Sequence, residues 1–425
     1  MFSPRRALSA PIRSLFIVLT LQGLAGPVQA DDSALTLSAA VGKALARAPE
    51  VSAQIANLDA ADALTISAGR LPDPELVLGI EDLPVSGADA YSLSRDSFTQ
   101  RKVGLMQAFP SASKRDAEKT LARSEVAVAK VGLARTRTQI AQTVALAWID
   151  RQQAEATLAR LADLTSQLAL QESLSRAALS GGRTSAADAL GAQAARAQST
   201  DRAIAARADV QRAVAALSRW LGADGANRLA EPPNFAVLPS AAANVLDSSH
   251  EHAIIAAIDA QIAAARAAVA LAQSAKRPDW SAELSYGNRA LFSDMVSLEF
   301  RVGLPIFAKN HQNPQILAKS AVLHQLESER DAELRMHRAE LQSVLADWYS
   351  SRERLALLER DRLPLAQTRI NFAASAYRSG NGPLRPVLDA TTDFIELQLS
   401  ALTLKAQLGR AWATLAYQSA PEIAP

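Results

Sequence analysis

The chain has 425 residues, of which 45 are basic and 43 acidic, and it contains no cysteine. Without cysteine, disulfide bonds, a lipid-anchoring N-terminal cysteine and thiolate metal sites are all excluded. The nearly balanced charge gives no reason to expect a nucleic-acid partner.

Residues 1–30 have the pattern of a secretory signal peptide. Three arginines precede an apolar run over residues 15–24, and a Val-Gln-Ala cleavage site ends at Ala30. The arginine pair at 5–6 leaves Sec and twin-arginine export both open. We expect no membrane helix after it, because charges interrupt even the most apolar run, 253–275. A membrane crossing would therefore have to use strands.

The first half, residues 31–222, is expected to form one structural unit. An Ala-rich helix over 37–66, capped by Thr36 or Ser38, precedes strands at about 75–81 and 99–109. A long helix over 113–179 follows, with a capping box at Ser113 and Asp116. The chain turns at a tip near 180–185, where Thr184 or Ser185 caps a return helix that ends at Gly222.

The second half, residues 250–418, repeats this plan after a linker at 223–249. A helix over 252–276 is followed by strands at about 280–287 and 295–304 and by a long helix that starts at Asn313 and Pro314. Pro364 is expected to kink that helix, and a tip near 380–384 leads to the final helix. Residues 419–425 are a tail. Short matches at an offset of about 200, such as Trp148 with Trp348 and Gly181 with Gly380, indicate an internal duplication.

Both long helices carry a seven-residue apolar repeat, which is typical of a left-handed coiled coil. In the first, the repeat is Val126, Leu133, Ile140, Ala147, Ala154, Leu161 and Leu168, and in the second it is Leu334, Leu341, Trp348 and Leu355. At 1.5 Å per residue, the first helix would be a rod of roughly 100 Å.

The strands alternate between apolar and polar residues, so that each has one apolar and one polar face. Each approaches the roughly 10 residues that a membrane strand needs. The alternative is a half-buried hairpin in a soluble domain, but the predominantly helical chain offers no sheet for it to join. The predicted lipid-facing residues are Leu76, Leu78, Ile80, Val103, Leu105, Leu284, Tyr286, Val296, Leu298, Phe300 and Val302.

Four strands cannot close a barrel, and an open sheet edge cannot face lipid. Two chains would supply eight strands, whose side chains fill the interior, whereas three would supply twelve and leave an aqueous lumen. The predicted fold is thus mainly α with a small β part: a coiled-coil helical barrel joined to a transmembrane β-barrel that trimerisation completes.

At this point the sequence resembles the TolC family of outer-membrane efflux proteins, over about residues 35–417. The resemblance rests on the duplicated plan and on runs at both tips, 182–190 and 376–390. Two more runs, 103–110 with Lys114-Arg115 and 304–307 with residues 310–312, are similar to the heavy-metal (cobalt–zinc–cadmium resistance) branch.

The resemblance implies a homotrimeric exit duct in the outer membrane of a Gram-negative cell, with its helices in the periplasm. It also implies a periplasmic adaptor (membrane fusion) protein and an inner-membrane proton-driven RND pump as partners. Family members close at the periplasmic tip, in some cases with inward aspartates. Asp389 matches such a position, while its companion is Pro386 and a latching arginine is replaced by Gly382.

Asp389 and Asp188 are therefore gate candidates, although each also suits the N-terminal turns of a helix. The candidate adaptor contacts at the tips are Gly181, Gly182, Arg183, Gly380, Asn381 and Gly382. The His250-x-His252 pair is better explained as a solvated linker than as a metal site, because no third ligand is near. We expect no cofactor and no catalytic role.

Two classes of function remain, a transport conduit and a non-conducting coiled-coil protein of the envelope. The amphipathic strands favour the conduit, because a coiled-coil spacer does not need them. Among conduits, heavy-metal export stands beside drug efflux and type I secretion.

Overall fold

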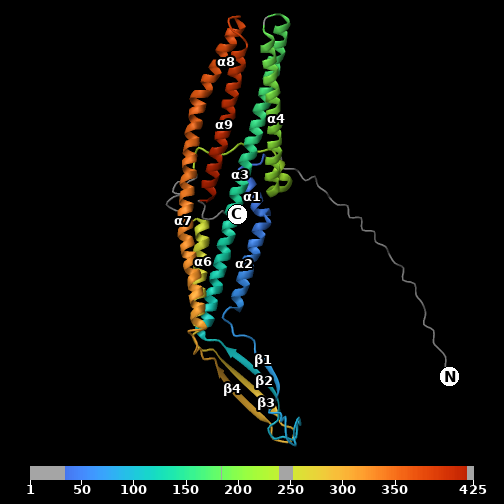
Figure 1. Cartoon of the computed structure of the whole chain (residues 1–425), viewed down its shortest axis with the longest axis vertical. Helices are drawn as coiled ribbons and strands as arrows, with labels where there is room; N and C mark the ends of the chain where they lie inside the picture. The colour runs from blue at the N-terminus through green and yellow to red at the C-terminus, as the bar shows by residue number, and fades with distance from the viewer. Residues whose placement is uncertain (1–33, 183, 239–251, 419–425) are drawn as a thin grey trace, which may run out of the picture. The chain divides into compact units, whose positions relative to one another are not determined.

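A computed structural model of the chain describes residues 34–182, 184–238 and 252–418. The predicted signal peptide, the C-terminal tail and much of the predicted linker lie outside these residues. The described chain consists mainly of helices with a single four-stranded sheet (Figure 1).

The first half contains four helices, two strands and a short 3₁₀ turn. These are α1 (Leu37–Arg47), α2 (Pro49–Ser67), β1 (Glu75–Glu81), β2 (Gln100–Phe109), α3 (Ala112–Ser180), α4 (Ala186–Leu221) and η1 (Gly222–Ala226). The second half has the same order of helix, strand pair and long helical hairpin. Its elements are α6 (Ala253–Ser274), β3 (Trp280–Asn288), β4 (Met295–Val302), α7 (Gln312–Leu357), the π-turn η3 (Leu358–Arg362), α8 (Leu363–Arg378) and α9 (Arg385–Gln418).

Three local expectations need correction. The helix predicted over 37–66 is broken between α1 and α2, because Pro49 disfavours helical geometry at Ala48, whose φ and ψ are −63° and 119°. The capping box at Ser113 does not form, because α3 starts at Ala112 and no side chain caps it. The second long helix begins at Gln312, so Pro314 is its third residue rather than its first.

Pro364 interrupts the second long helix, as expected. It has no N–H for the helical ladder and its ring crowds the carbonyl one turn earlier. The backbone responds with the π-turn Leu358–Arg362, which separates α7 from α8. The irregularity therefore lies in the turn that precedes the proline.

Equivalent tryptophans confirm the internal duplication. The indole N–H of Trp148 donates to the carbonyl of Leu35 at 3.0 Å, and that of Trp348 donates to the carbonyl of Phe235 at 2.9 Å. The two donors are 200 residues apart in the sequence, and so are the two acceptors. The segment around Phe235, predicted to be linker, is thus the counterpart of the segment that precedes α1.

The seven-residue repeats point into the helical core. Leu133, Ile140, Leu161 and Leu168 of α3 are buried, as are Leu341 and Trp348 of α7. One core cluster joins α1, α3, the end of α4 and α9, and a second joins α7 to α9. The coiled-coil interpretation of these helices is therefore confirmed.

The four strands form one antiparallel sheet in the order β1-β2-β3-β4. The β2–β3 pair joins the two halves of the chain, with Leu105 opposite Leu284. Because β2 runs into α3 and β4 into α7 after short connections, the sheet lies at one end of the helices (Figure 1).

Contrary to our expectation, one helix of the described chain, α6, is long and apolar enough to cross a membrane. The structure packs α6 against α3 and α7. Its charged residues bond to α7, where Asp259 pairs with Arg330 and Arg266 with Glu327. A helix in the core of a helical protein can have the same length and apolar composition as a membrane-spanning helix, so these two properties do not distinguish the two.

Candidate functional site

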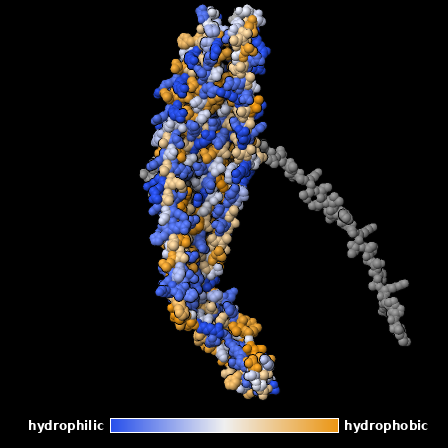
Figure 2. Space-filling model, viewed as in Figure 1, coloured by the Kyte–Doolittle hydropathy of each residue, from blue (hydrophilic) through white to orange (hydrophobic). Residues whose placement is uncertain are grey.

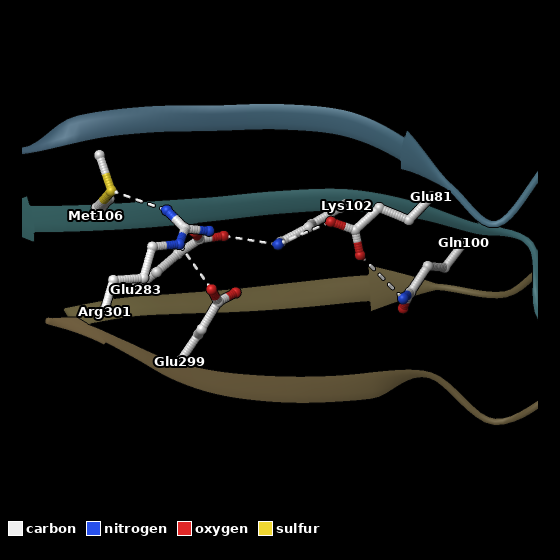
Figure 3. Close-up of polar contacts among 7 residues, drawn as sticks. All are labelled: Glu81, Gln100, Lys102, Met106, Glu283, Glu299 and Arg301. Carbon is white, nitrogen blue, oxygen red and sulfur yellow. Dashed lines mark hydrogen bonds and ion pairs between the residues drawn. The ribbon is translucent and has the colours of Figure 1, made fainter. Parts of the chain in front are cut away.

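The polar face of the sheet carries a chain of charged side chains (Figure 3). Glu283 of β3 lies at its centre and is only 2% exposed. Lys102 Nζ of β2 lies 2.7 Å from Glu283 Oε1, and Arg301 Nη2 of β4 donates to Glu283 Oε2 at 2.9 Å. One carboxylate therefore ties together three strands.

Two further carboxylates extend this chain of charged side chains to all four strands. Lys102 also donates to Glu81 of β1 at 2.9 Å, and Arg301 donates to Glu299 at 2.7 Å (Figure 3). The register places Glu283 directly opposite Glu299, a like-charge pair that would be unfavourable alone. Arg301 bonds to both carboxylates and so compensates their repulsion. We define the charge ladder as Glu81, Lys102, Glu283, Glu299 and Arg301.

The opposite face of the sheet is apolar and exposed. All eleven residues predicted to face lipid lie on it, with exposures between 43% and 71%. Cross-strand partners such as Leu105 with Leu284 and Leu284 with Leu298 make the apolar band continuous over the strands. Figure 2 shows apolar residues gathered on the visible surface of the strand region. An exposed patch of this kind marks a surface that another apolar phase or molecule covers.

An aromatic contact joins β3 to the end of β2, and polar contacts of Asp279 fix this part of the sheet to the start of α3. Trp280 stacks on Phe109 with ring centroids 4.1 Å apart. Asp279 accepts hydrogen bonds from the backbone N–H of Ser111 at 2.8 Å and from Lys114 Nζ at 2.9 Å. Burial alone would raise the pKa of Asp279, but these donors hold it below its ordinary value.

Glycines make the turns at both hairpin tips. Gly182 and Gly380 have φ values of +67° and +75°, which favour glycine over residues with a Cβ. The predicted tip residues Gly181, Gly182, Gly380, Asn381 and Gly382 all lie in these two turns, and Arg183 lies outside the described residues.

Asp188 belongs to a helix cap. The Ser185 Oγ accepts from the Asp188 backbone N–H at 3.1 Å and donates to the Asp188 carboxylate at 2.7 Å. The hydrogen bond from the Ser185 side chain is the main cause that lowers the pKa of Asp188. These contacts account for Asp188 as a residue that stabilises the start of α4.

Asp389, in contrast, makes only a loose ion pair among the described residues. It lies in the second turn of α9, its side chain is 61% exposed, and its carboxylate is 3.8 Å from the Arg385 guanidinium. It is therefore available to a surface contact or to a cation.

An apolar cluster holds the two hairpins together near their tips. Leu161, Leu164 and Leu168 of α3 pack with Ala192 of α4 and with Leu384, Leu388 and Ile395 at the start of α9. Both tips therefore lie at the end of the helices away from the sheet (Figure 1).

The expectation that His252 lies in a solvated linker was wrong. His252 is 4% exposed, and its Nδ1 is 2.7 Å from Nε2 of His337, which is 3% exposed. His250 lies outside the described residues. Sequence reasoning missed this pair because 85 residues separate its members and only helix packing brings them together. Within the ranges that the structure describes, no three His, Asp or Glu side chains are arranged to hold a metal ion.

No protein-family profile matches the sequence, and no curated protein matches it. Solved structures do resemble the chain. The outer membrane protein VceC from Vibrio cholerae has a TM-score of 0.76 at 20% identity, over 90% of this chain and 95% of that one. The CmeC outer membrane channel of Campylobacter jejuni has 0.73 at 13% identity, over 97% and 94%.

CusC, whose structures describe folding and transmembrane channel formation, has a TM-score of 0.74 at 16% identity, over 90% of this chain and 91% of that one. All three likenesses extend over nearly the full length of both chains. The chain therefore has the fold of these outer-membrane channel proteins.

Proposed function

We propose that this chain is a TolC-family outer-membrane exit duct that works as a homotrimer. The observation that carries the proposal is the sheet, which has an exposed apolar face and a charge ladder on the other face. Such a sheet separates lipid from water, provided that its edges are closed.

Closure explains why more than one chain is needed. In the described chain β1 and β4 each have one neighbour, so each leaves one edge unpaired. Pairing β4 of one copy with β1 of the next satisfies both edges, and three copies make a twelve-stranded ring wide enough for an aqueous lumen. The charge ladder then lines the lumen and the apolar band faces lipid.

The helices extend this duct into the periplasm in the proposed assembly. At 69 residues, α3 is a rod of roughly 100 Å. The two tips lie at the end away from the sheet, and there they would meet a periplasmic adaptor joined to an inner-membrane RND pump. A passive duct coupled to a pump needs no catalytic site of its own.

We further propose heavy-metal cations as the cargo, on the basis of the sequence runs that are similar to the cobalt–zinc–cadmium branch. Drug efflux and type I secretion are the alternatives. The cargo is tested by deleting the gene in its own host and measuring growth inhibition by Co²⁺, Zn²⁺ and Cd²⁺ beside a panel of drugs. Sensitisation to drugs alone would overturn the metal proposal and leave the duct proposal intact.

Conduction is tested with the purified protein in planar lipid bilayers. We expect stepwise, long-lived conductance, and we expect Ser297→Arg to change its size because Ser297 lies on the polar face of β4. A protein that inserts without conducting would instead support the envelope spacer that the heptad repeats also suit.

A further inference from the structure

The buried histidine pair joins two elements that are far apart in the sequence. His252 immediately precedes α6, and His337 lies within α7. Their rings meet edge to face, with centroids 5.0 Å apart and an interplanar angle of 79°. This contact holds the first turn of α6 against α7.

Only one hydrogen fits between the two facing nitrogens at 2.7 Å. One ring donates through it and the other accepts, so at least one facing nitrogen must be unprotonated. When both rings are protonated, both facing nitrogens are donors and the two positive charges repel each other. The doubly protonated pair cannot keep the contact.

Charged groups of both signs surround the pair, and the cavity beside it is lined by Glu340 as well as by Arg135. Arg135 of α3 lines the same cavity, and the N-terminus of α6 presents the positive end of its dipole. Burial lowers the pKa of His337, while Glu340 and Glu333 of its own helix act to raise it. The α9 residue that lines the cavity is the uncharged Gln418.

Asp259 and Arg330, farther along α6 and α7, pair with each other. Their opposite charges therefore largely cancel as seen from the histidines.

Space for the open state exists beside the pair. The cavity, about 220 Å³, is lined by residues of α3, α6, α7 and α9. The buried Nδ1 of His337 has no hydrogen-bond partner among the described residues. A hydrated cavity can stabilise the protonated rings once they separate.

We propose that His252 and His337 form an acid-sensitive latch, which holds the start of α6 on α7 while one ring is neutral and releases it when both are protonated. The latch responds to the pH of the solution around the helices. The proposal does not depend on the proposed duct function. Because α6 leads into β3, release loosens the end of α6 that lies away from the sheet.

The direction of the pH response follows from proton binding. A histidine in the open state titrates near its ordinary pKa of about 6.5, whereas the closed latch binds fewer protons. The latch is therefore fully stable above about pH 6.5. Its opening equilibrium rises as the pH falls, by up to about tenfold per pH unit.

Hydrogen exchange of the full chain in detergent micelles tests this proposal, with a chelator present to exclude metal effects. The measured quantity is the amide hydrogen-exchange rate in peptides from residues 253–262, corrected for the intrinsic dependence of amide exchange on pH. Between pH 7.5 and pH 5.5 we expect the local opening equilibrium of the wild type to rise about tenfold.

His337→Gln and His252→Gln each replace a titrating ring with a neutral side chain that can still bond to its partner. Both variants should lose the acid response, whatever their protection at pH 7.5. His324→Gln is the matched control, because the His324 side chain is 85% exposed on the same helix as His337, and it should respond as the wild type does. No acid response in the wild type, or a tenfold response that persists in both pair variants, would overturn the latch.

Discussion

Glu283 is the residue on which the charge ladder depends. Nearly all of its surface is covered, and its carboxylate bonds to cations from the strands on both sides. A carboxylate in this position is favourable only while both cations are present, because a buried charge without a partner is costly. Without Glu283, Lys102 would keep its pair with Glu81 and Arg301 its pair with Glu299, but the contact that joins the two cations would be lost.

We therefore expect Glu283→Gln to destabilise the sheet more than any other neutralisation in the ladder. The variant keeps the shape of the side chain but leaves Lys102 and Arg301 without their shared partner. Glu299→Gln is the control, because the Glu299 side chain is 49% exposed and its one ion pair among the described residues is with Arg301. Thermal dissociation of the purified assembly should show a clearly lower midpoint for Glu283→Gln and a small change for Glu299→Gln. Equal midpoints would mean that the ladder does not stabilise the sheet.

Asp389 allows a prediction about conduction at the tips. Three copies of this exposed carboxylate at a narrow end would prefer cations and would let multivalent cations block the channel, since a bound cation relieves their repulsion. Asp389→Ala should weaken both effects in planar bilayers without loss of assembly. Asp393→Ala removes the same charge one turn later, from an ion pair with Arg369 at 2.9 Å, and should leave both unchanged. If the two variants conduct alike, Asp389 only supports the start of α9.

At the scale of the element, each strand has to present opposite chemistry on its two faces. Leu298 and Ser297 are neighbours in β4 but point to opposite sides. Leu298→Arg should impair assembly in lipid, because a cation near the bilayer midplane costs about 2–4 kcal/mol in a barrel. Ser297→Arg and Ser285→Arg should assemble and alter conductance. The yield of folded protein in liposomes decides between them, and similar yields for both classes would show that the faces have been assigned wrongly.

The elements were predicted with unequal success, and the reason is physical. The heptad repeat was sufficient to predict α3 as one uninterrupted helix, and the alternation of Leu284, Tyr286, Leu298 and Phe300 gave the strand faces. These patterns are local. The Lys102–Glu283 and His252–His337 contacts depend on strand register and helix rotation between segments that are 181 and 85 residues apart, which the periodicity of either segment does not determine.

At the scale of the whole molecule, the two unpaired edges of the sheet require a strand partner from another chain in the proposed barrel. The backbone groups of β1 and β4 that face outward have no strand partner within the described chain, and in the proposed membrane position lipid could not supply one. A head-to-tail contact between these edges either closes into a ring or continues indefinitely. In the proposed duct, three copies would supply twelve strands, enough for a ring around an aqueous lumen.

Because the chain has no native cysteine, introduced pairs can test this closure directly. Val77 of β1 and Ser297 of β4 lie on the polar face of the two edge strands. In one register of the contact between subunits, Val77→Cys with Ser297→Cys would bring two thiols together. In the next register, shifted by two residues, Val77→Cys with Glu299→Cys would do so. Cross-strand Cβ atoms about 4.5–5.5 Å apart lie close to disulfide geometry. Mild oxidation should give bands of one, two and three chains on a non-reducing gel and none larger. Leu78→Cys with Ser297→Cys places the thiols on opposite faces and should give only single chains. A ladder that continues beyond three chains would show an open polymer and contradict the closed trimer.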